Sequence, residues 1–381
     1  MTKTSASSGL RTTLCRDPKA FEALGPEWEN LYRRCATATP FQTHAWLHSW
    51  WLSYGSAGRL RLVLVRKDGR LVGAAPLMLD HRPLPVLVPV GGGISDFFDV
   101  LLDDACADAA AHALARGLHR AAHTSLVDLR EVRPGAAAER VLSHWPGRVR
   151  RLTDSVCLEL PALPMDQLLE RLPTSSARRS RSKLRRLDHL GIEHRSVPEH
   201  EVPAAVATLL ELHGMQWRDR GVTPEHLRPR FAEHLSRAAR QMVGTGDATL
   251  TQYRIGERVL AADVTLMSPD LAGGYLYGVH PDLRAKADVT TMLLRHDTAH
   301  AASTGRSVVS MLRGTEQSKR HWRPVQVANR RLLLAARPLG PALDLYTAQV
   351  TGWSRLAAVI RQRFPALRAG LDHLRLRAGR R

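Results

Sequence analysis

The order of helices and strands expected from the sequence occurs twice along the chain, and this repetition limits the possible folds more than any other feature. Each half has the order helix, helix, hairpin, strand, helix, strand. The hairpin of the first half turns at Asp68-Gly69, and that of the second half turns at Gly256-Glu257. The two halves share this order but no detectable sequence repeat. The sequence therefore predicts an α/β protein of two tandem units, each with a mixed central sheet flanked by helices.

Hydrophobic spacing and turn residues place the expected elements. The first half is expected to hold helices over residues 21–36, after Thr43 and over 104–122, and strands over 59–65, 71–79 and 126–129, with short strands near Pro89 and Leu102. The second half is expected to hold helices over 202–220, 229–243 and 289–304, and strands over 248–254, 259–267, 274–279 and 307–311.

These elements suggest five segments along the chain. They are a flexible N-terminus over 1–20, a first unit over 21–160, a basic connecting segment over 161–200, a second unit over 201–335 and a basic amphipathic helical tail over 336–381, kinked at Pro365.

The formal net charge of +19 on 381 residues is the strongest signal in the composition. Such a surface attracts polyanions, so RNA, an anionic membrane and a phosphorylated cofactor are all candidate partners. An Arg-rich composition inherited from GC-rich coding explains the same charge without any partner.

Hydropathy and cysteine spacing favour a cytoplasmic protein. The sequence contains no run of eighteen apolar residues, so no transmembrane helix is expected. The four cysteines are scattered without metal-ligand spacing, so we expect reduced thiols and no metal site.

One motif lies near the end of the second half, where Leu312-Arg313-Gly314 is followed by Lys319 and Trp322. With the preceding segments 278–282 and 291–294, it resembles the end of a GNAT-type acyltransferase domain, of the subgroup named for CelD-type proteins of cellulose biosynthesis. Weaker likenesses in the first half are Pro40-Phe41-Gln42-Thr43 with Trp46, the Asp68-Gly69 hairpin and the stretch 95–99. The resemblance spans about residues 20–325.

The same two-unit layout resembles the Fem-type transferases, which move an amino acid from aminoacyl-tRNA onto an amine. Together the resemblances imply acyl transfer, with either acyl-CoA or aminoacyl-tRNA as the donor. GNAT enzymes hold the pyrophosphate of acyl-CoA on a Gly-rich turn that opens a helix. The equivalent turn of this chain, residues 284–290, has no glycine. Arg284 and Lys286 remain candidates for phosphate contact, and Asp288 either opposes a phosphate or caps the following helix.

The family motif supplies further candidates for donor binding. Arg313, beside Gly314, suits a phosphate or carboxylate clamp because its guanidinium is a planar fork. A structural ion pair with Glu316 is the alternative. Lys319 is a candidate for contact with donor phosphate or with the oxyanion of the reaction, and Trp322 is expected to pack the motif in place.

Acyl transfer to an amine needs a neutral attacking nitrogen and a stabilised oxyanion. Asp263 stands in a strand that is otherwise apolar, so a buried carboxyl with a raised pKa is expected there. Tyr277 and His280 are further candidates, as a proton donor and as a general base, along with Lys319. Core packing for Tyr277 and a turn for His280 are the structural alternatives.

Candidates for binding the acceptor lie in the first half. Asp96 and Asp99 follow a Gly-rich stretch and suit a cationic amine, and Trp46 is a candidate for lining a cleft. A solvated loop explains the acids equally well, and core packing explains the tryptophan.

A basic run precedes the second unit. It contains Arg178, Arg179, Arg181, Lys183, Arg185 and Arg186. Without interleaved aromatic residues it fits an RNA backbone or a membrane surface better than stacking on bases. A solvated helix face is the alternative. The basic tail fits peripheral membrane contact or docking on the protein body.

The sequence thus favours an N-acyltransferase that moves an acyl group from acyl-CoA to a primary amine of a small molecule. A Fem-type transferase that uses aminoacyl-tRNA is the first alternative, and an inactive GNAT-like protein that binds RNA or membrane is the second. The sequence carries no prediction of an oligomeric state.

Overall fold

The computed structural model describes residues 9–81, 83–217 and 223–363, and the chain divides into two compact units. Unit 1 consists of residues 9–154 together with 329–363, and unit 2 consists of residues 155–328. Both boundaries fall inside strands, β7 (Arg148–Pro161) and β13 (Val325–Ala335). Unit 2 is therefore inserted into the sequence of unit 1.

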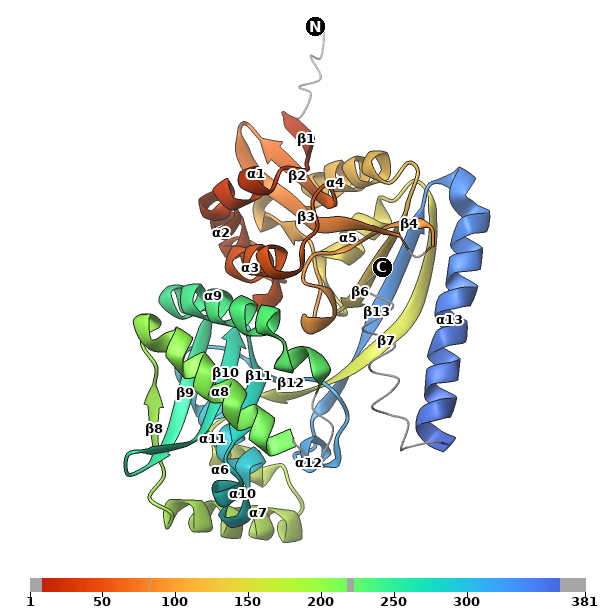
Figure 1. Ribbon diagram of the computed structural model, residues 1–381. Coiled ribbons are helices and arrows are strands. Elements are labelled where there is room, and N and C mark those ends of the chain that lie inside the picture. Colours follow the sequence, from red (N-terminus) through yellow and green to blue (C-terminus); the bar gives the residue numbers. More distant parts are fainter. Residues whose placement is uncertain (1–8, 82, 218–222, 364–381) are drawn as a thin grey trace, which may run out of the picture. The chain divides into compact units, whose positions relative to one another are not determined.

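Unit 1 is an α/β unit with a mixed sheet (Figure 1). Its other strands are β1 (Leu10–Cys15), β2 (Leu60–Lys67), β3 (Arg70–His81), β4 (Pro85–Pro89), β5 (Leu101–Leu102) and β6 (Leu126–Val132). Its α-helices are α1 (Pro18–Ala23), α2 (Gly25–Arg33), α3 (His44–Tyr54), α4 (Ala107–Ala121), α5 (Ala137–Ser143) and α13 (Gly340–Arg363). Short 3₁₀ turns lie at Pro40–Gln42, Gly92–Ile94, Asp104–Cys106 and Arg337–Leu339.

The strands of unit 1 follow the order β1-β2-β3-β4-β6-β13-β7, with β5 beside β3. β4 and β6 pair in parallel, whereas β1–β2, β2–β3, β3–β4 and β6–β13 are antiparallel pairs. Side chains of β2 alternate, so that Val63 and Val65 pack in the core with α4 and α5 while Leu62 and Leu64 are buried on the other face. Helices are thus needed on both faces of this sheet.

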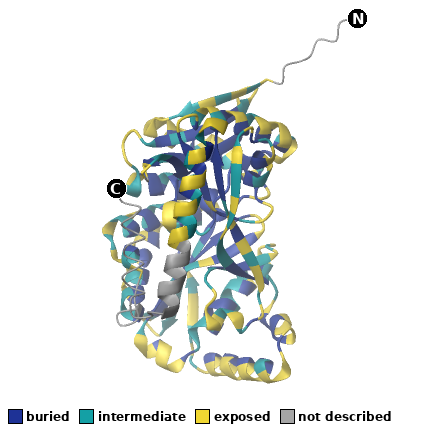
Figure 2. Cartoon of the chain, turned by 90° about the vertical axis from the view of Figure 1, so that its right-hand side faces the viewer, coloured by how far each residue is buried: buried dark blue, intermediate teal, exposed yellow. Residues whose placement is uncertain are grey.

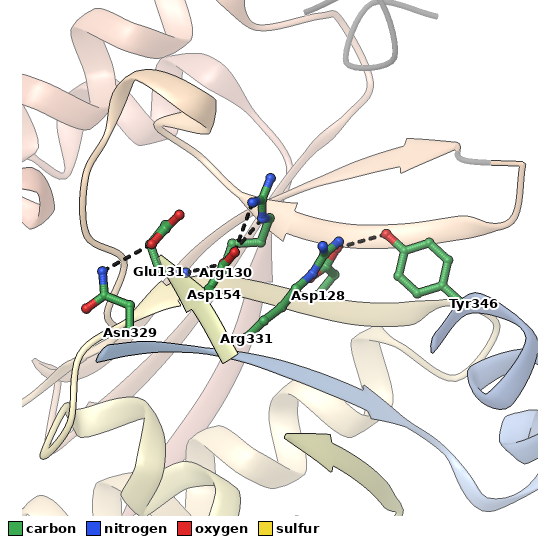
Figure 3. A network of polar contacts seen from close by, with 7 residues as sticks. All are labelled: Asp128, Arg130, Glu131, Asp154, Asn329, Arg331 and Tyr346. Atoms are coloured by element: carbon green, nitrogen blue, oxygen red, sulfur yellow. Dashed lines mark hydrogen bonds and ion pairs between the residues drawn. The ribbon is translucent and has the colours of Figure 1, made fainter. Parts of the chain in front are cut away.

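A buried polar network in unit 1 joins β6, β13 and α13 (Figure 3). Arg331 on β13 donates from Nε to Oδ1 of the fully buried Asp128 at 2.7 Å, and the Tyr346 hydroxyl on α13 donates to Oδ2 of the same carboxylate at 2.8 Å. The other polar pairs of the network are Arg130–Asp154 at 3.1 Å and Asn329–Glu131 at 3.1 Å. Removing one partner would leave a buried charge uncompensated, so this network fixes α13 to its own sheet.

Unit 2 is a second α/β unit (Figure 1). Its helices are α6 (Met165–Glu170), α7 (Thr174–Asp188), α8 (Val202–Trp217), α9 (Pro229–Thr245), α10 (Pro281–Lys286), α11 (Val289–Ser303) and α12 (Gln317–Arg320), with 3₁₀ turns at Glu199–Glu201 and Pro224–Leu227. Its own strands are β8 (Glu193–Ser196), β9 (Ala248–Ile255), β10 (Arg258–Met267), β11 (Leu271–Val279) and β12 (Val308–Arg313).

The strands of unit 2 follow the order β7-β12-β11-β10-β9-β8, and only β11 and β12 pair in parallel. Helices α8 and α9 pack on β9–β11, while α11 packs on β11 and β12 with α6 and α7 against it. The expected mixed sheets flanked by helices are confirmed, and unit 2 has the same order of parallel and antiparallel neighbours around its central pair as unit 1.

Some elements differ from the sequence-based expectation. Strand β1 occupies Leu10–Cys15, within the stretch expected to be flexible, because every residue of it pairs with β2. The stretch 161–200, expected to be a connecting segment, holds α6, α7 and β8, and the apolar residues of α6 and α7 enter the core of unit 2. Pro365 and the rest of the tail beyond residue 363 lie outside the described residues.

No helix in the described ranges combines the length and the hydrophobicity needed to cross a bilayer. All four cysteines are free thiols.

Candidate active site

The candidate site of unit 2 begins where its two parallel strands separate. Strands β11 and β12 pair over three residues only, from Leu271↔Val308 to Gly273↔Ser310. Strand β12 then becomes irregular between Ser310 and Arg313, with Leu312 at a φ of 55°. Beyond Gly273 the register with β12 ends, so the edge of β11 presents backbone groups that a ligand can bond.

A β-bulge lies at the same place on the other side of β11. The pairing with β10 shifts between Val264 and Thr265, because Tyr275 is an extra residue between the partners Leu276 and Gly274. A bulge of this kind bends and twists its strand, which helps to turn β11 away from β12. Asp263 and Tyr277, both predicted to be catalytic, are direct cross-strand partners next to this bulge.

Two carboxyl groups meet beside the bulge. The Thr265 hydroxyl lies 3.2 Å from Oδ2 of Asp263 and 2.9 Å from Oδ1 of Asp297, which projects from α11. Burial and the neighbouring Asp297 raise the pKa of Asp263 well above its ordinary value, and burial raises the pKa of Asp297 to about 7. The expectation of a buried carboxyl with a raised pKa at Asp263 therefore agrees with the geometry.

His213 on α8 is bonded to the same stretch of β11, and His226, from the 3₁₀ turn at Pro224–Leu227, is bonded to His213. Nδ1 of His213 lies 2.7 Å from the Tyr277 carbonyl oxygen, and its Nε2 lies 3.2 Å from Nδ1 of His226. A carbonyl only accepts, so Nδ1 of His213 carries the proton and its Nε2 accepts from His226. Burial lowers the pKa of both rings, that of His226 to about 4, and both are neutral at pH 7.

A pocket of about 270 Å³ lies between α7 and the turn from α10 into α11. Its lining residues are Lys183, Arg186, Leu187, Ala285, Lys286, Ala287 and Asp288. Two sets of residues that were predicted separately thus meet: Lys183 and Arg186 of the basic run, and Lys286 of the turn. Arg284 is exposed on α10 and is not part of the lining.

Asp288 opens α11 as its N-cap. Its Oδ1 accepts from the Thr291 amide at 2.9 Å, and its Oδ2 is paired with the Lys183 ammonium at 2.6 Å. Burial opposes ionisation, but the bonds from Lys183 and Thr291 outweigh it and leave the pKa of Asp288 lowered. Capping, one of the two expected roles of Asp288, is confirmed. Lys183, Arg186 and Lys286 line the same pocket as the Asp288 carboxylate, at the positive end of the α11 helix dipole.

The turn after β12 is held by Lys319. Its ammonium donates to the carbonyl oxygens of Met311 at 2.8 Å and Arg313 at 3.0 Å and is paired with Glu316 at 3.1 Å, so three acceptors match its three donors. Gly314 has a φ of 119°, and a Cβ there would lie 2.5 Å from the Glu316 carboxylate oxygens. Trp322 is buried in the core of unit 2, as expected. Donor binding by Arg313, Gly314 and Lys319 remains a prediction.

His280 begins α10 as its N-cap. Its Nδ1 accepts from the Asp282 amide at 3.2 Å, so this nitrogen serves the helix end. The structural alternative for His280 is therefore present. The role of His280 as a general base stays a prediction. Only its Nε2 could accept the proton, because Nδ1 is occupied by the Asp282 amide.

The residues expected to bind the acceptor lie in unit 1 and are differently placed. Trp46 is fully buried and donates from Nε1 to the Ser95 hydroxyl at 2.8 Å. Asp99 is 1 % exposed, and its oxygens accept from the amides of Val100, Ala137 and Ala138 at 2.7 to 2.8 Å. Both side chains are thus bonded within unit 1, and Asp96 is half-buried. Acceptor binding by Trp46, Asp96 and Asp99 stays a prediction.

The basic run forms one face of α7. Arg178, Arg179, Arg181, Lys183, Arg185 and Arg186 are all exposed. Ala177, Ser180, Leu184 and Leu187 are buried on the opposite face, so the helix is amphipathic (Figure 2 colours buried and exposed residues). The expectation that this run stays out of the core is confirmed for its basic side chains.

Four residues of the site were not singled out from the sequence as functional. They are His213, His226, Thr265 and Asp297. His213 carried a weak signal, since it is a histidine on the apolar face of an expected helix. Asp297 carried none, because a carboxylate on a helix that begins and ends at the surface is usually solvated.

Comparison with known proteins supports the resemblance seen in the motifs. Residues 174–320, which lie within unit 2, match the family model described as an acetyltransferase (GNAT) domain. A search of the curated proteins finds no match to the chain.

Several solved structures share the fold of both units. FemX superposes with a TM-score of 0.58 at 12% identity over 81% of this chain and 95% of its own. A conserved protein of unknown function from Bacteroides thetaiotaomicron gives 0.55 at 10% identity over 85% and 100%. L-PGS from Bacillus licheniformis gives 0.53 at 13% identity over 87% and 96%. At these identities the likeness shows the fold. The segment that matches the GNAT acetyltransferase domain contains the diverging strands, the carboxyl pair and the basic pocket, and this match supports an acyltransferase.

Proposed function

We propose that this chain is a cytoplasmic N-acyltransferase that moves an acyl group from acyl-CoA to a primary amine of a small molecule. The observation that carries the proposal is the pocket at the start of α11, where Lys183, Arg186 and Lys286 gather around a helix N-terminus. Phosphate oxygens suit such a place, because cationic side chains and the helix dipole both favour negative charge there.

The strands give the donor a path from its phosphates to the reaction. Strand β11 ends at Val279 and leads through α10 to the pocket, while its other end meets the point where β12 diverges. The five residue-to-residue steps from Val279 back to Gly274 span roughly 17 Å of strand. A donor held by its phosphates at the pocket would lay its acyl arm along this unpaired edge, with the thioester near Gly274.

The reaction itself is an exchange of one bond for another. The amine nitrogen attacks the thioester carbonyl, the C–N bond forms and the C–S bond breaks. The nitrogen gives up a proton, and the leaving CoA thiolate ends as a thiol. The protein must hold the two reactants together and accept that proton.

Aminoacyl-tRNA is the second candidate donor. FemX is among the structures that share the fold, and the exposed basic face of α7 belongs to the same helix that supplies Lys183 and Arg186 to the pocket. A tRNA would use that face for its phosphate backbone, whereas acyl-CoA would need only the pocket.

Binding measurements with Lys286→Ala test the proposal. Acetyl-CoA should raise the melting temperature of the wild type. Removal of one charge-assisted hydrogen bond of about 1.5–3 kcal/mol should weaken acetyl-CoA binding roughly 10- to 100-fold in calorimetry. Arg181→Ala is the matched control, since Arg181 is an exposed cation of α7 outside the pocket lining, and its affinity should equal that of the wild type.

Saturating acetyl-CoA that leaves the wild-type melting temperature unchanged would count against the CoA donor. A complex with bulk tRNA that survives moderate salt would then favour the second candidate, because nonspecific charge attraction is lost as salt rises.

A further inference from the structure

The contacts of Thr265 show that its two carboxyl neighbours share a proton. The Thr265 hydroxyl oxygen lies within hydrogen-bond distance of both Asp263 and Asp297, but the hydroxyl has only one hydrogen to donate. It donates to one carboxylate, so the other contact needs a carboxylic acid that donates to the hydroxyl oxygen. The shorter contact, 2.9 Å, is with Asp297, and Asp263 is the more deeply buried of the two. The protonated acid is therefore Asp263, and Asp297 carries the charge.

The charged member of the pair lies at the edge of the candidate site. A Cβ built on Gly274 would lie 3.4 Å from Oδ2 of Asp297, so this oxygen is beside the backbone of Gly274. Gly274 is exposed and directly follows Gly273, the last residue of β11 that pairs with β12. Asp297 is only partly buried, unlike Asp263. Its outer oxygen is thus placed where an acyl group on the free edge of β11 would meet its acceptor.

The groups around the pair leave it without a fixed cation. Tyr253 on β9 is a buried phenol beside Asp263; burial raises its pKa, and the charges of Asp263 and Asp297 and a hydrogen bond to Asp263 add to this effect. On α11 itself, His296 is bonded to the Thr251 hydroxyl at 3.2 Å and packs against His194, and Arg295 is paired with Asp188 at 2.7 Å.

We propose that Asp297 is the catalytic base of this acyltransferase and that Thr265 and Asp263 are positioning residues that hold it. The inference rests on the proposed function, which supplies the amine. The N–H bond of the attacking nitrogen breaks, the proton passes to Oδ2 of Asp297, and the nitrogen electron pair forms the C–N bond. The proton then passes to the leaving thiolate, which restores the Asp297 carboxylate.

The protonation state of Asp297 suits this task. Burial raises its pKa to about 7, so its basic form grows as pH rises through neutrality. Asp263 keeps its proton over the same range, since burial and the charge of Asp297 both disfavour its ionisation. We therefore expect kcat to rise with pH along one acid limb near neutrality, a limb that belongs to the pair.

Asp297→Asn tests the base directly. Transfer from acetyl-CoA to a panel of small primary amines should fall about 10²- to 10⁴-fold in kcat, with the KM for acetyl-CoA unchanged. Glu257→Gln is the matched acid-to-amide control, because Glu257 is fully exposed in the turn between β9 and β10. A decrease of less than threefold in Asp297→Asn, or an equal decrease with His226→Gln alone, would overturn the assignment.

Thr265 variants separate positioning from mere folding. Thr265→Val removes the hydrogen bond to the Asp297 carboxylate, which raises the pKa of Asp297 and moves the acid limb of kcat to higher pH. Thr265→Ser keeps the hydroxyl and should restore the wild-type limb. If the acid limb of the kcat–pH profile lies at the same pH in Thr265→Val as in the wild type, Thr265 has no positioning role, even if the variant has a lower melting temperature.

A readout without acyl transfer keeps this inference separate from the donor. Asp99 is a second buried carboxyl whose pKa burial raises to about 7, so the carbon-13 NMR spectra of aspartate-labelled protein are recorded in the Asp99→Asn background. There a carboxyl should titrate near pH 7, and this titration should be absent from the double variant Asp99→Asn/Asp297→Asn. Two carboxyls ionised throughout neutral pH would refute the shared proton whatever the donor is. Failure of acetyl-CoA as a donor with this titration intact would fault only the proposed function.

Discussion

One ammonium group, that of Lys319, closes the turn after β12 by bonding two carbonyl oxygens and one carboxylate. Its neighbour Arg313 ends the strand and shares the family motif but is half-buried rather than enclosed by this turn. The two cations of the motif therefore have different expected effects when they are removed.

Lys319→Ala should lower the free energy of unfolding by about 1–3 kcal/mol, because it leaves buried carbonyl oxygens without donors. Arg313→Ala should instead abolish acyl transfer while the unfolding curve stays that of the wild type. Denaturant unfolding and the acetyl-transfer assay check both. Full activity in Arg313→Ala would remove that residue from the site.

Single residues show where sequence reasoning ends. Asp263 was predictable because a carboxylate in an apolar strand must be buried and needs a partner. Asp297 was not, because its environment is made by a strand that lies far away in sequence. Asp99 looked like part of a solvated loop, but the amides of Ala137 and Ala138 bury it as a helix anchor.

Among the elements, α7 combines a buried apolar face with an exposed basic one. The apolar face holds α7 in the core, whereas the basic face is the one that can meet a partner. Substitutions on the apolar face should therefore change stability, and substitutions on the basic face should change binding. The pocket takes Lys183, Arg186 and Leu187 from this helix.

Replacing Arg178, Arg181 and Arg185 together by Gln should leave the melting temperature within error, because all three side chains are exposed. Binding of bulk tRNA should weaken, and the slope of its logarithm against log salt should shrink by about 0.7–0.9 for each phosphate that the variant no longer neutralises. Filter binding across a salt series measures the slope. An unchanged slope would show that this face of α7 does not meet nucleic acid.

The hairpins were predictable as elements from the sequence, whereas strands β1 and β13 were not. Asp68 and Gly69 both adopt positive φ, 50° and 83°, as the two-residue turn between β2 and β3 demands. Strand β1 has three polar residues in succession, Arg11 to Thr13, and β13 begins with four exposed or half-buried residues, so neither starts with the apolar signal of a strand. β1 and β13 are strands because they pair with strands that are distant in sequence, and a local sequence pattern does not contain that information.

At the scale of the whole molecule, the two units differ in what lies beyond the paired residues of their parallel strands. In unit 1, β4 and β6 pair only at Val86↔Leu126 and Leu87↔Val127, and further along β6 Val132 pairs with Phe98. The chain of unit 1 thus fills the place beyond its own parallel pair, whereas in unit 2 the register between β11 and β12 ends at Gly273↔Ser310.

We therefore expect one molecule of acetyl-CoA per chain in calorimetry. Phe98→Ala should lower the free energy of unfolding by about 3–5 kcal/mol, since the side chain is buried in the core of unit 1, and leave the affinity for acetyl-CoA as it was. Two molecules bound per chain, or a weaker affinity in Phe98→Ala, would show that unit 1 also holds a donor.

The place of β13 between β6 and β7 has a consequence for how the protein is made. Unit 1 receives this strand only after all of unit 2 has been translated, since residues 155–328 precede most of it. The ribosome therefore delivers the complete catalytic half first, while the N-terminal half waits with a gap in its sheet. Until residue 335 has emerged, the nascent N-terminal half exposes the unpaired edges of β6 and β7, and a chaperone that covers such edges would have its longest opportunity there.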